Sequence, residues 1–175
     1  MPNYEIPVMP STPVAIIACA IHCCDNKVYD LGSYKDQSPC MALGKKKDTC
    51  VRQNVKKAVE KNKIKNVQID PKTKQTVTVQ TKKGPVSVDC KPDFMVDNRI
   101  IDAKFSCDPK KLTPKMAPIG KRANVQDRSV GAAKKTPKEK LAYPKMKGPD
   151  GKKVKGVRVM GPKEAAKKKG NCKCS

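Results

Sequence analysis

Hydrophobic and polar residues alternate along the segment from Asp93 to Phe105, and this pattern predicts a β-hairpin. Asp97 and Asn98 have the composition of a two-residue turn, because both residue types tolerate the left-handed backbone that such turns need. The resulting register places Asp93 directly opposite Asp102, with Cβ atoms roughly 5 Å apart. The other predicted pairs are Val96–Arg99, Met95–Ile100 and Phe94–Ile101.

The two faces of this hairpin differ in chemistry. Lys104 follows Asp102 by two positions, so it projects from the same face as the two carboxylates. The opposite face is apolar and suited to a core, and it consists of Phe94, Val96, Ile101, Ala103 and Phe105.

Apolar residues at helical spacing precede the hairpin and predict a helix that runs to about Lys63. Asp48 is its predicted N-cap. The apolar residues form one stripe, which consists of Val51, Val55, Ala58 and Val59. Glu60 lies to the side of the stripe. It either pairs with Lys56 one turn earlier or turns inward toward the hairpin.

Further strands are predicted on both sides of the hairpin. Threonine and valine alternate over residues 75–81, residues 82–85 reverse the chain, and residues 86–90 form a second strand. The hairpin supplies the third strand over residues 98–105, and valines over residues 153–160 fit another.

Two short helices are predicted near the C-terminus. Thr136 and Glu139 form a capping-box pattern around Pro137, and Glu164 follows Pro162 in a similar way, with a glycine stop at position 170. Both glutamates are interpreted as helix-start residues rather than catalytic groups. Lys140 and Tyr143, between the two helices, are weaker candidates for contacting phosphate.

The first 47 residues are expected to form a proline- and cysteine-containing extension, and residues 48–175 one domain. Four prolines in residues 1–14 predict an extended lead-in. The apolar run Val14–Ile21 is too short to span a bilayer. It lacks a preceding basic region and a cleavage site, so no signal peptide is predicted.

The composition indicates a polyanionic partner. The formal net charge is +23 in 175 residues. A basic protein gains affinity for nucleic acid by releasing counterions, whatever the base sequence. Aromatic residues are few, tryptophan is absent and prolines number 15. We therefore expect a modest folded centre with long irregular basic segments, including a loop over residues 108–136 that could guide a nucleic-acid strand.

The facing carboxylates indicate a cation site. Like charges directly across a strand pair are destabilising, so either a shared proton or a hard divalent metal should offset the repulsion between Asp93 and Asp102. Mg²⁺ prefers carboxylate oxygens together with water and substrate phosphate. Lys104, beside the pair, could stabilise developing negative charge or help deprotonate a water. Lys91, across the predicted hairpin, should favour a neutral Lys104.

These residues resemble a nuclease family. Pro92-Asp93 followed by Asp102-Ala103-Lys104 is similar to the PD-(D/E)xK signature of the restriction-endonuclease-like nucleases. The segment from Lys91 to Phe105 most resembles the C-terminal nuclease toxin domains of bacterial polymorphic toxins, including type VI secretion effectors. The resemblance covers residues 85–107 firmly and 48–160 loosely.

The resemblance implies an α+β fold with a small restriction-endonuclease-like core, in which helices flank a mostly antiparallel β-meander. It implies that Asp93 and Asp102 bind Mg²⁺ or Mn²⁺, that the backbone carbonyl of Ala103 assists, and that Lys104 aids the nucleophilic water. A helical glutamate often completes such sites, and Glu60 is the candidate. The implied activity is phosphodiester hydrolysis, in DNA more than RNA. The implied biology is an antibacterial effector injected into the cytoplasm of a target bacterium and silenced by an acidic immunity protein.

Nine cysteines leave two interpretations open. Cys19 and Cys23 would share a helical face beside His22, the only histidine, so zinc is a weak alternative at these three residues. Disulfides are an equal alternative, because small-core proteins that leave their cell often use them. Their connectivity does not follow from sequence, although Cys172 and Cys174 are expected to be free or crosslinked upstream.

Two other function classes stay open. The first is a non-enzymatic basic nucleic-acid-binding protein, which would bind DNA in EDTA without cutting it. The second is a cysteine-stabilised secreted interaction protein, whose activity would depend on its disulfides rather than on the carboxylates.

Overall fold

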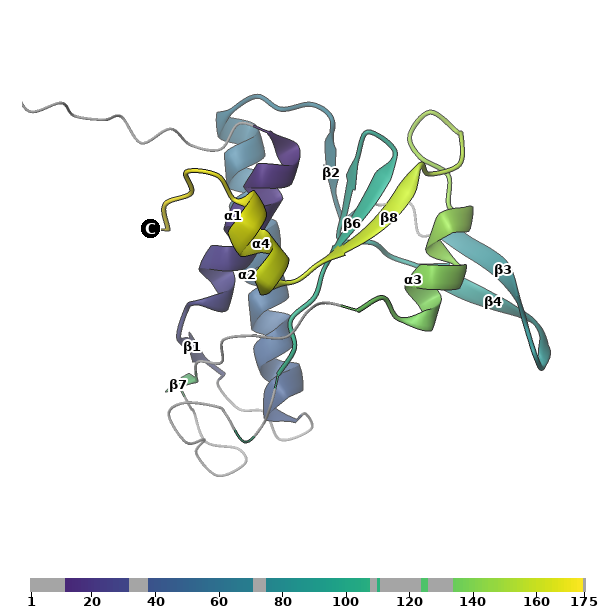
Figure 1. Cartoon of the computed structure of the whole chain (residues 1–175), viewed down its shortest axis with the longest axis horizontal. Helices are drawn as coiled ribbons and strands as arrows, with labels where there is room; N and C mark the ends of the chain where they lie inside the picture. The colour runs from purple at the N-terminus through teal and green to yellow at the C-terminus, as the bar shows by residue number, and fades with distance from the viewer. Residues whose placement is uncertain are drawn as a thin grey trace, which may run out of the picture.

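The computed structural model describes residues 12–31, 38–70, 75–107, 110, 124–125 and 134–174. It confirms the α+β class, with two long helices packed beside a mixed sheet (Figure 1). The helices are α1 (Pro13–Asp25), α2 (Pro39–Lys61), α3 (Pro137–Leu141) and α4 (Pro162–Lys168), with one 3₁₀ turn, η2 (Tyr143–Lys145). The strands are β1 (Tyr29–Asp30), β2 (Val67–Ile69), β3 (Gln75–Thr81), β4 (Gly84–Cys90), β5 (Phe94–Val96), β6 (Arg99–Ala103), β7 (Asn124–Val125) and β8 (Gly156–Met160).

Helix α2 begins earlier than the sequence pattern indicated. Ser38 is its N-cap, with a side-chain oxygen that accepts a hydrogen bond from the Met41 amide at 3.2 Å, and Pro39 occupies the first turn. The prediction that Asp48 caps the helix is therefore wrong, and Asp48 lies in the helix interior. The apolar stripe is confirmed, since Val51 and Val55 are buried.

The predicted division at residue 47 falls inside α2. Helix α1 packs against both α2 and α4. Its buried Ile17 and Ile21 share one hydrophobic core with Phe94 and Ile101 of the hairpin. The structure therefore shows α1 packed as part of the same core and not as a separate extension. Of the predicted extended lead-in, residues 1–11 lie outside the described residues.

The predicted hairpin is confirmed residue by residue. β5 pairs with β6 in the register Phe94–Ile101, Met95–Ile100, Val96–Arg99. Asp97 and Asn98 form the turn with φ of 48° and 62°, in the left-handed region. The apolar face is confirmed too, since Phe94, Val96, Ile101 and Ala103 are buried and Phe105 packs at the edge of the same core.

The sheet differs from the expected meander. Its order is β2-β5-β6-β8, and β8 runs parallel to β6. β3 and β4 form a separate two-stranded sheet, which extends to one side of the body (Figure 1). The antiparallel pairing of β3 with β4 was readable in sequence, but their separation from the central sheet was not, because strand partners outside a hairpin depend on packing between distant segments.

The hairpin turn is enclosed by a later loop. Asn98 is 8% exposed, and its carbonyl accepts a hydrogen bond from the Lys155 amide at 2.8 Å. A Cβ on Gly148 would lie 2.0 Å from the Asn98 side-chain oxygen, so a larger residue at this position would require the Asn98 side chain to move.

Four disulfides join distant parts of the described chain. They are Cys19–Cys172, Cys23–Cys174, Cys24–Cys50 and Cys40–Cys107. Of the two alternatives expected for Cys172 and Cys174, free or crosslinked upstream, the structure shows the crosslinked one, because both attach the C-terminal tail to α1. Cys90 is a buried free thiol.

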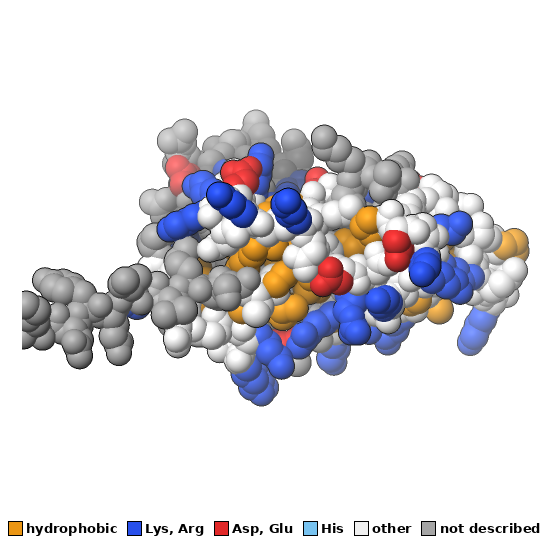
Figure 2. Space-filling model, turned by 90° about the horizontal axis from the view of Figure 1, so that it is seen from above, with side chains coloured by type: hydrophobic (Ala, Val, Ile, Leu, Met, Phe, Trp, Pro, Cys, Tyr) orange, Lys and Arg blue, Asp and Glu red, His pale blue; other side chains and the backbone are white. Residues whose placement is uncertain are grey.

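Lysine and arginine side chains are spread over the face shown in Figure 2, with few acidic side chains among them. Among the described helices, none combines the length and the apolar character that crossing a bilayer requires. The predicted guide loop over residues 108–136 lies outside the described residues, apart from Lys110, β7 and residues 134–136.

Candidate active site

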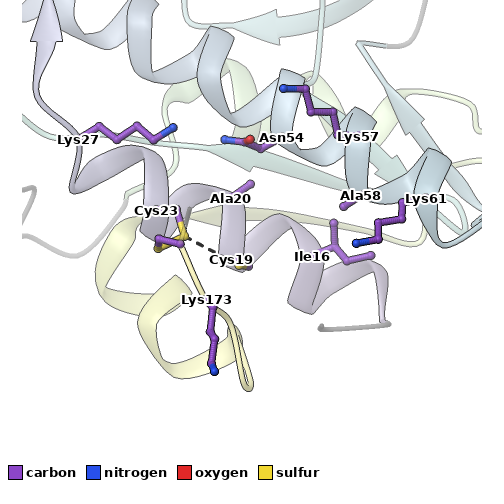
Figure 3. A pocket seen from close by; sticks show the side chains of 11 residues that line it. Ile16, Cys19, Ala20, Cys23, Lys27, Asn54, Lys57, Ala58, Lys61 and Lys173 are labelled. Carbon is purple, nitrogen blue, oxygen red and sulfur yellow. Dashed lines mark hydrogen bonds between the residues drawn. A yellow bond between two sulfur atoms is a disulfide. The ribbon is translucent and has the colours of Figure 1, made fainter. Parts of the chain in front are cut away.

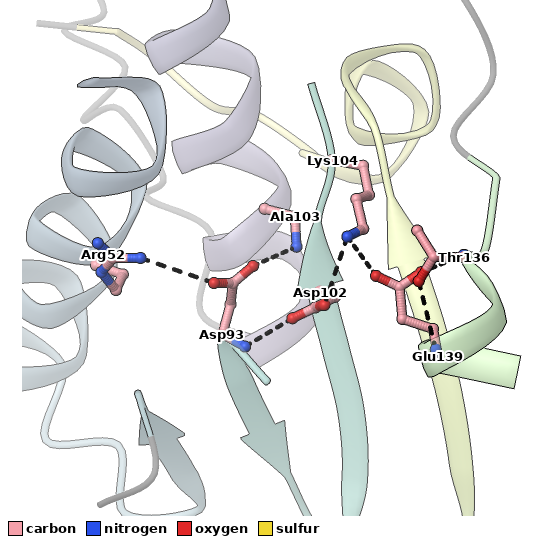
Figure 4. A network of polar contacts seen from close by, with 7 residues as sticks. All are labelled: Arg52, Asp93, Asp102, Ala103, Lys104, Thr136 and Glu139. Atoms are coloured by element: carbon pink, nitrogen blue, oxygen red, sulfur yellow. Dashed lines mark hydrogen bonds and ion pairs between the residues drawn. The ribbon is translucent and has the colours of Figure 1, made fainter. Parts of the chain in front are cut away.

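Asp93 and Asp102 lie side by side at the open end of the β5–β6 hairpin (Figure 4). The Asp93 amide donates to Oδ1 of Asp102 at 2.7 Å, and the Ala103 amide donates to Oδ2 of Asp93 at 2.9 Å. Each carboxylate is thus fixed by a backbone amide next to the other. This exchange is a consequence of the register, because it requires position 93 to face position 102.

The pair is electrostatically unfavourable when both groups are charged. Burial raises the pKa of Asp102 to about 7, and the neighbouring charge of Asp93 adds to the effect. Burial also raises the pKa of Asp93, with the charge of Asp48 as the next cause. Buried carboxylates that repel one another are a common feature of functional sites. The two side chains retain a proton readily and would release it to a cation.

Asp48 of α2 is the third acid near the pair. Burial raises its pKa, and the charges of Arg52, Asp102 and Lys104 act on it from the surroundings. Sequence reasoning missed this residue because it treated Asp48 as a helix cap. The available signal was its spacing: Asp48 precedes Val51 by three residues, so a helix extended toward its N-terminus puts Asp48 on the buried side.

Glu60, the glutamate predicted for this role, is exposed in the last turn of α2. The structure does not bring Glu60 to the carboxylate pair, because twelve positions of helix separate it from Asp48. At 1.5 Å per residue that corresponds to about 18 Å along the helix axis. Asp48, and not Glu60, is therefore the acid of α2 whose charge acts on the pair.

The orientation of α2 is fixed by the residue before Asp48. Lys47 is 1% exposed and forms an ion pair with Asp25 of α1 at 2.7 Å, and its ammonium lies 5.3 Å from the centre of the Phe105 ring. A buried charge left without a partner is strongly destabilising. Lys47 therefore holds α2 in one rotation, which keeps Asp48 facing the hairpin. Arg52, one turn later, lies 3.7 Å from Oδ1 of Asp93.

Lys104 projects toward the carboxylates, as predicted, with its Nζ 3.9 Å from Oδ2 of Asp102. It also forms an ion pair with Glu139 of α3. Burial lowers the pKa of Lys104, but the hydrogen bond to Glu139 and the charges of Asp102, Glu139 and Asp93 outweigh it, and the net pKa is raised. The prediction of a neutral lysine is therefore wrong. Lys91 is exposed and is not among the main causes of this shift.

Glu139 has two roles in the structure. The predicted capping box is confirmed, because its side chain accepts from the Thr136 amide at 2.5 Å while its own amide donates to the Thr136 hydroxyl. The same side chain is 2% exposed and contacts Lys104. Burial raises the pKa of Glu139, but the bonds from Lys104 and Thr136 outweigh it, so the net pKa is lowered. The capping signal was sufficient to explain Glu139 in sequence, which is why its second contact was missed.

Tyr143 of η2 is 3% exposed, and its pKa is raised first by burial and then by the negative charge of Asp102. Its phenol is therefore buried near Asp102, and its contact with phosphate stays a prediction. Lys140 is exposed.

The donor set fits a hard divalent cation. Oxygen ligands from buried, mutually repelling carboxylates suit Mg²⁺ or Mn²⁺. Among the described residues, one group of three potential metal ligands has all its ligand atoms within 4.8 Å of one another, and it consists of Cys19, Cys23 and Cys172. No group of three carboxylates in this part of the chain meets the same distance. Asp93 and Asp102 are thus the direct ligand candidates, and Asp48 is a further acid whose charge acts on Asp93. Ala103 adjoins the pair through its amide, and its carbonyl as a ligand stays a prediction.

The structure does not bring Cys19, His22 and Cys23 together as a set of free zinc ligands. Cys19 and Cys23 form disulfides with Cys172 and Cys174, so their sulfurs are not thiolates in this state. His22 is not part of the cysteine trio.

Comparison of the chain with models of protein families, with curated proteins and with solved structures finds no match.

Proposed function

We propose that the protein is a metal-dependent nuclease that hydrolyses phosphodiester bonds, in DNA rather than RNA. The observation that carries the proposal is the Asp93–Asp102 pair, in which Asp102 is buried and Asp93 is partly buried, with Lys104 beside it. A solvated hairpin that only kept an edge soluble would expose these groups. Instead Asp102 is 5% exposed and has a pKa near neutrality.

Each side chain has a role that follows from its surroundings. Asp93 and Asp102 would hold Mg²⁺ or Mn²⁺, and Asp48 would complete the acidic set. Such an ion, when bound, supplies a water of lowered pKa and neutralises charge on the scissile phosphate. The resemblance of residues 92–104 to the PD-(D/E)xK signature supports the same roles.

Lys104 acts as a fixed positive charge in this proposal. Its raised pKa and its ion pair with Glu139 keep it protonated near neutral pH, so it stabilises negative charge on the phosphoryl oxygens instead of accepting a proton. Glu139 sets both its position and its charge.

The net charge of +23 supports a polyanionic substrate. As the resemblance implies, we further propose that the chain acts as an antibacterial effector in the cytoplasm of a target cell, with an acidic immunity protein as its partner. These two statements depend on the nuclease activity and are tested after it.

Plasmid cleavage tests the proposal. The wild-type protein should cut plasmid DNA with Mg²⁺ and lose this activity in EDTA. Asp102→Ala and Lys104→Ala should each reduce the rate by about 10²–10³-fold, as expected for groups that contact reacting charge. Lys163→Ala, which removes an exposed charge on α4, is the matched control and should keep activity. Full activity in both site variants would disprove the assignment, and DNA binding without cleavage would favour the non-enzymatic nucleic-acid-binding class.

A second candidate function is a cysteine-stabilised extracellular binding protein. It is favoured by the four disulfides, since such bonds persist mainly in oxidising compartments. It predicts that reduction abolishes binding to an acidic surface while Asp102→Ala has no effect. The nuclease proposal predicts instead that Asp102→Ala strongly reduces activity.

A further inference from the structure

Four cysteine sulfurs gather where the C-terminal tail crosses α1, and Figure 3 shows the side chains of Cys19 and Cys23 on that helix beside the tail. Cys19 and Cys23 are one turn apart on α1 and share a face. The tail after α4 brings Cys172 and Cys174 to that face, where each forms one of the two disulfides. The sulfurs of different disulfides are also close, because Cys23 Sγ lies 3.6 Å from Cys172 Sγ and 4.0 Å from Cys19 Sγ.

These spacings match a tetrahedral thiolate site. With Zn–S bonds of about 2.3 Å, neighbouring sulfurs of a four-cysteine zinc site are about 3.8 Å apart. The two distances between disulfides lie on either side of this value, and the sulfurs of Cys19, Cys23 and Cys172 are all within 4.8 Å of one another. We propose that Cys19, Cys23, Cys172 and Cys174 form a zinc site when the two disulfides are reduced.

The chemistry requires a reductant, for which a dithiol suffices. Thiol–disulfide exchange transfers four electrons and four protons to the two disulfides, giving four protein thiols, while two dithiol molecules close to cyclic disulfides. Zn²⁺ then binds the sulfurs as thiolates and releases their protons to solvent. Each pair of bonded sulfurs must separate to the tetrahedral spacing. Cys174, which lies outside the trio, moves with the last residues of the tail.

The electrostatic surroundings favour this product. A zinc ion with four thiolates carries a net charge of −2. The cysteines Cys19, Cys23 and Cys174 line a cavity of about 180 Å³ whose lining contains no acidic residue. Its basic lining residues are Lys27, Lys57, Lys61 and Lys173. Positive neighbours lower thiol pKa values and stabilise the thiolate form.

The site would keep the tail attached under reducing conditions. In the oxidised protein the two disulfides attach the tail to α1, and in the reduced protein zinc would make the same connection with the same four side chains. The tail of a protein that meets both oxidising and reducing compartments would then stay in place in each. This inference does not depend on the proposed nuclease activity.

Metal binding to the reduced full-length chain tests the proposal. The protein is reduced with a dithiol, desalted without oxygen and titrated with Zn²⁺ against a chromophoric chelator, and in parallel with Co²⁺. The wild type should bind one Zn²⁺ per chain, and Co²⁺ should give the intense charge-transfer and ligand-field bands of a tetrahedral thiolate site. Cys172→Ser/Cys174→Ser should lower the zinc affinity by at least about 100-fold, because half of the ligands are lost.

The matched control is Cys40→Ser/Cys107→Ser, which removes a different disulfide and the same number of thiols. It should bind Zn²⁺ like the wild type. Limited proteolysis of the reduced wild type should show a tail protected by Zn²⁺ and exposed by chelator. The proposal is overturned if the reduced wild type fails to bind one Zn²⁺, or if both double variants lose affinity equally. Loss of secondary structure on reduction leaves the test valid, since zinc should then restore it.

Discussion

The carboxylate pair of the β5–β6 hairpin is held by bonds between residues close in sequence, whereas the C-terminal tail is held on α1 by crosslinks that span almost the whole chain. The hydrogen bonds around Asp93 and Asp102 join positions 9 and 10 residues apart. The two tail disulfides join positions 153 and 151 residues apart. The hairpin brings together carboxylates that repel one another. The two tail disulfides contribute stability without placing a charged group at the candidate site.

The contrast indicates that different regions of the molecule serve stability and the proposed chemistry. Unfavourable electrostatics are concentrated where the proposed chemistry takes place, and covalent constraint is concentrated elsewhere. Changes to the tail should therefore alter the free energy of unfolding with little effect on turnover. Changes around the hairpin should do the reverse.

The largest effect on stability is expected from removing the tail disulfides. Cys172→Ser/Cys174→Ser, in oxidised protein, should lower the free energy of unfolding by about 4 kcal/mol. Most of that loss belongs to one crosslink, because the second closes only a short additional loop. Denaturant unfolding measures the change. Cleavage per folded molecule should stay unchanged, and a parallel loss of activity would remove the contrast between the two regions.

Replacing Asp48 of α2 should change activity and leave the free energy of unfolding nearly unchanged. Asp48→Asn should reduce plasmid cleavage by about 100-fold, because it removes one carboxylate from the acidic set. Glu60→Gln is the matched control on the same helix and should have no effect. If Glu60→Gln proves the more damaging change, the helical acid is Glu60 after all.

Glu139 should influence the rate through Lys104. Glu139→Gln should lower turnover by about 30-fold and shift the basic limb of the pH–rate profile to lower pH, since Lys104 loses the partner that raises its pKa. Glu164→Gln removes the acid of the other short helix, which pairs with Arg158, and should leave the profile unchanged. An unshifted profile in Glu139→Gln would mean that Glu139 serves only the capping box.

The smallest effect is a pH dependence of stability. The pKa of Asp102 is about 7 in the folded protein and near 3.9 in an unfolded chain. Because the folded pKa is raised, the protonated form stabilises the fold below pH 4, and this contribution is lost as the pH rises to about 7. The measurement compares the free energy of unfolding of the wild type with that of Asp102→Asn, both in EDTA. The wild-type value minus the variant value should fall by about 1–2 kcal/mol between pH 4 and pH 8. Added Mg²⁺ at pH 8 should stabilise the wild type more than the variant. A difference that stays flat with pH would mean that the carboxylates are not coupled.

The sequence by itself determined the hairpin, its register and the face that carries Asp93, Asp102 and Lys104. These features depend on alternation and on a turn whose residues tolerate left-handed backbone, which are interactions between neighbours in the chain. The capping box of α3 was readable for the same reason, whereas α4 begins at Gly161 without a side-chain cap and its Glu164 pairs with Arg158 instead.

Only the tertiary structure decided which other groups surround that face. Asp48 and Glu139 are 45 and 37 positions from Asp93 and Asp102, respectively, and their approach depends on how α2 and α3 pack. The pairing of Cys19 with Cys172 depends on the tail returning to α1. Such contacts are selected by the shape and burial of the assembled core, which no local pattern of residues encodes.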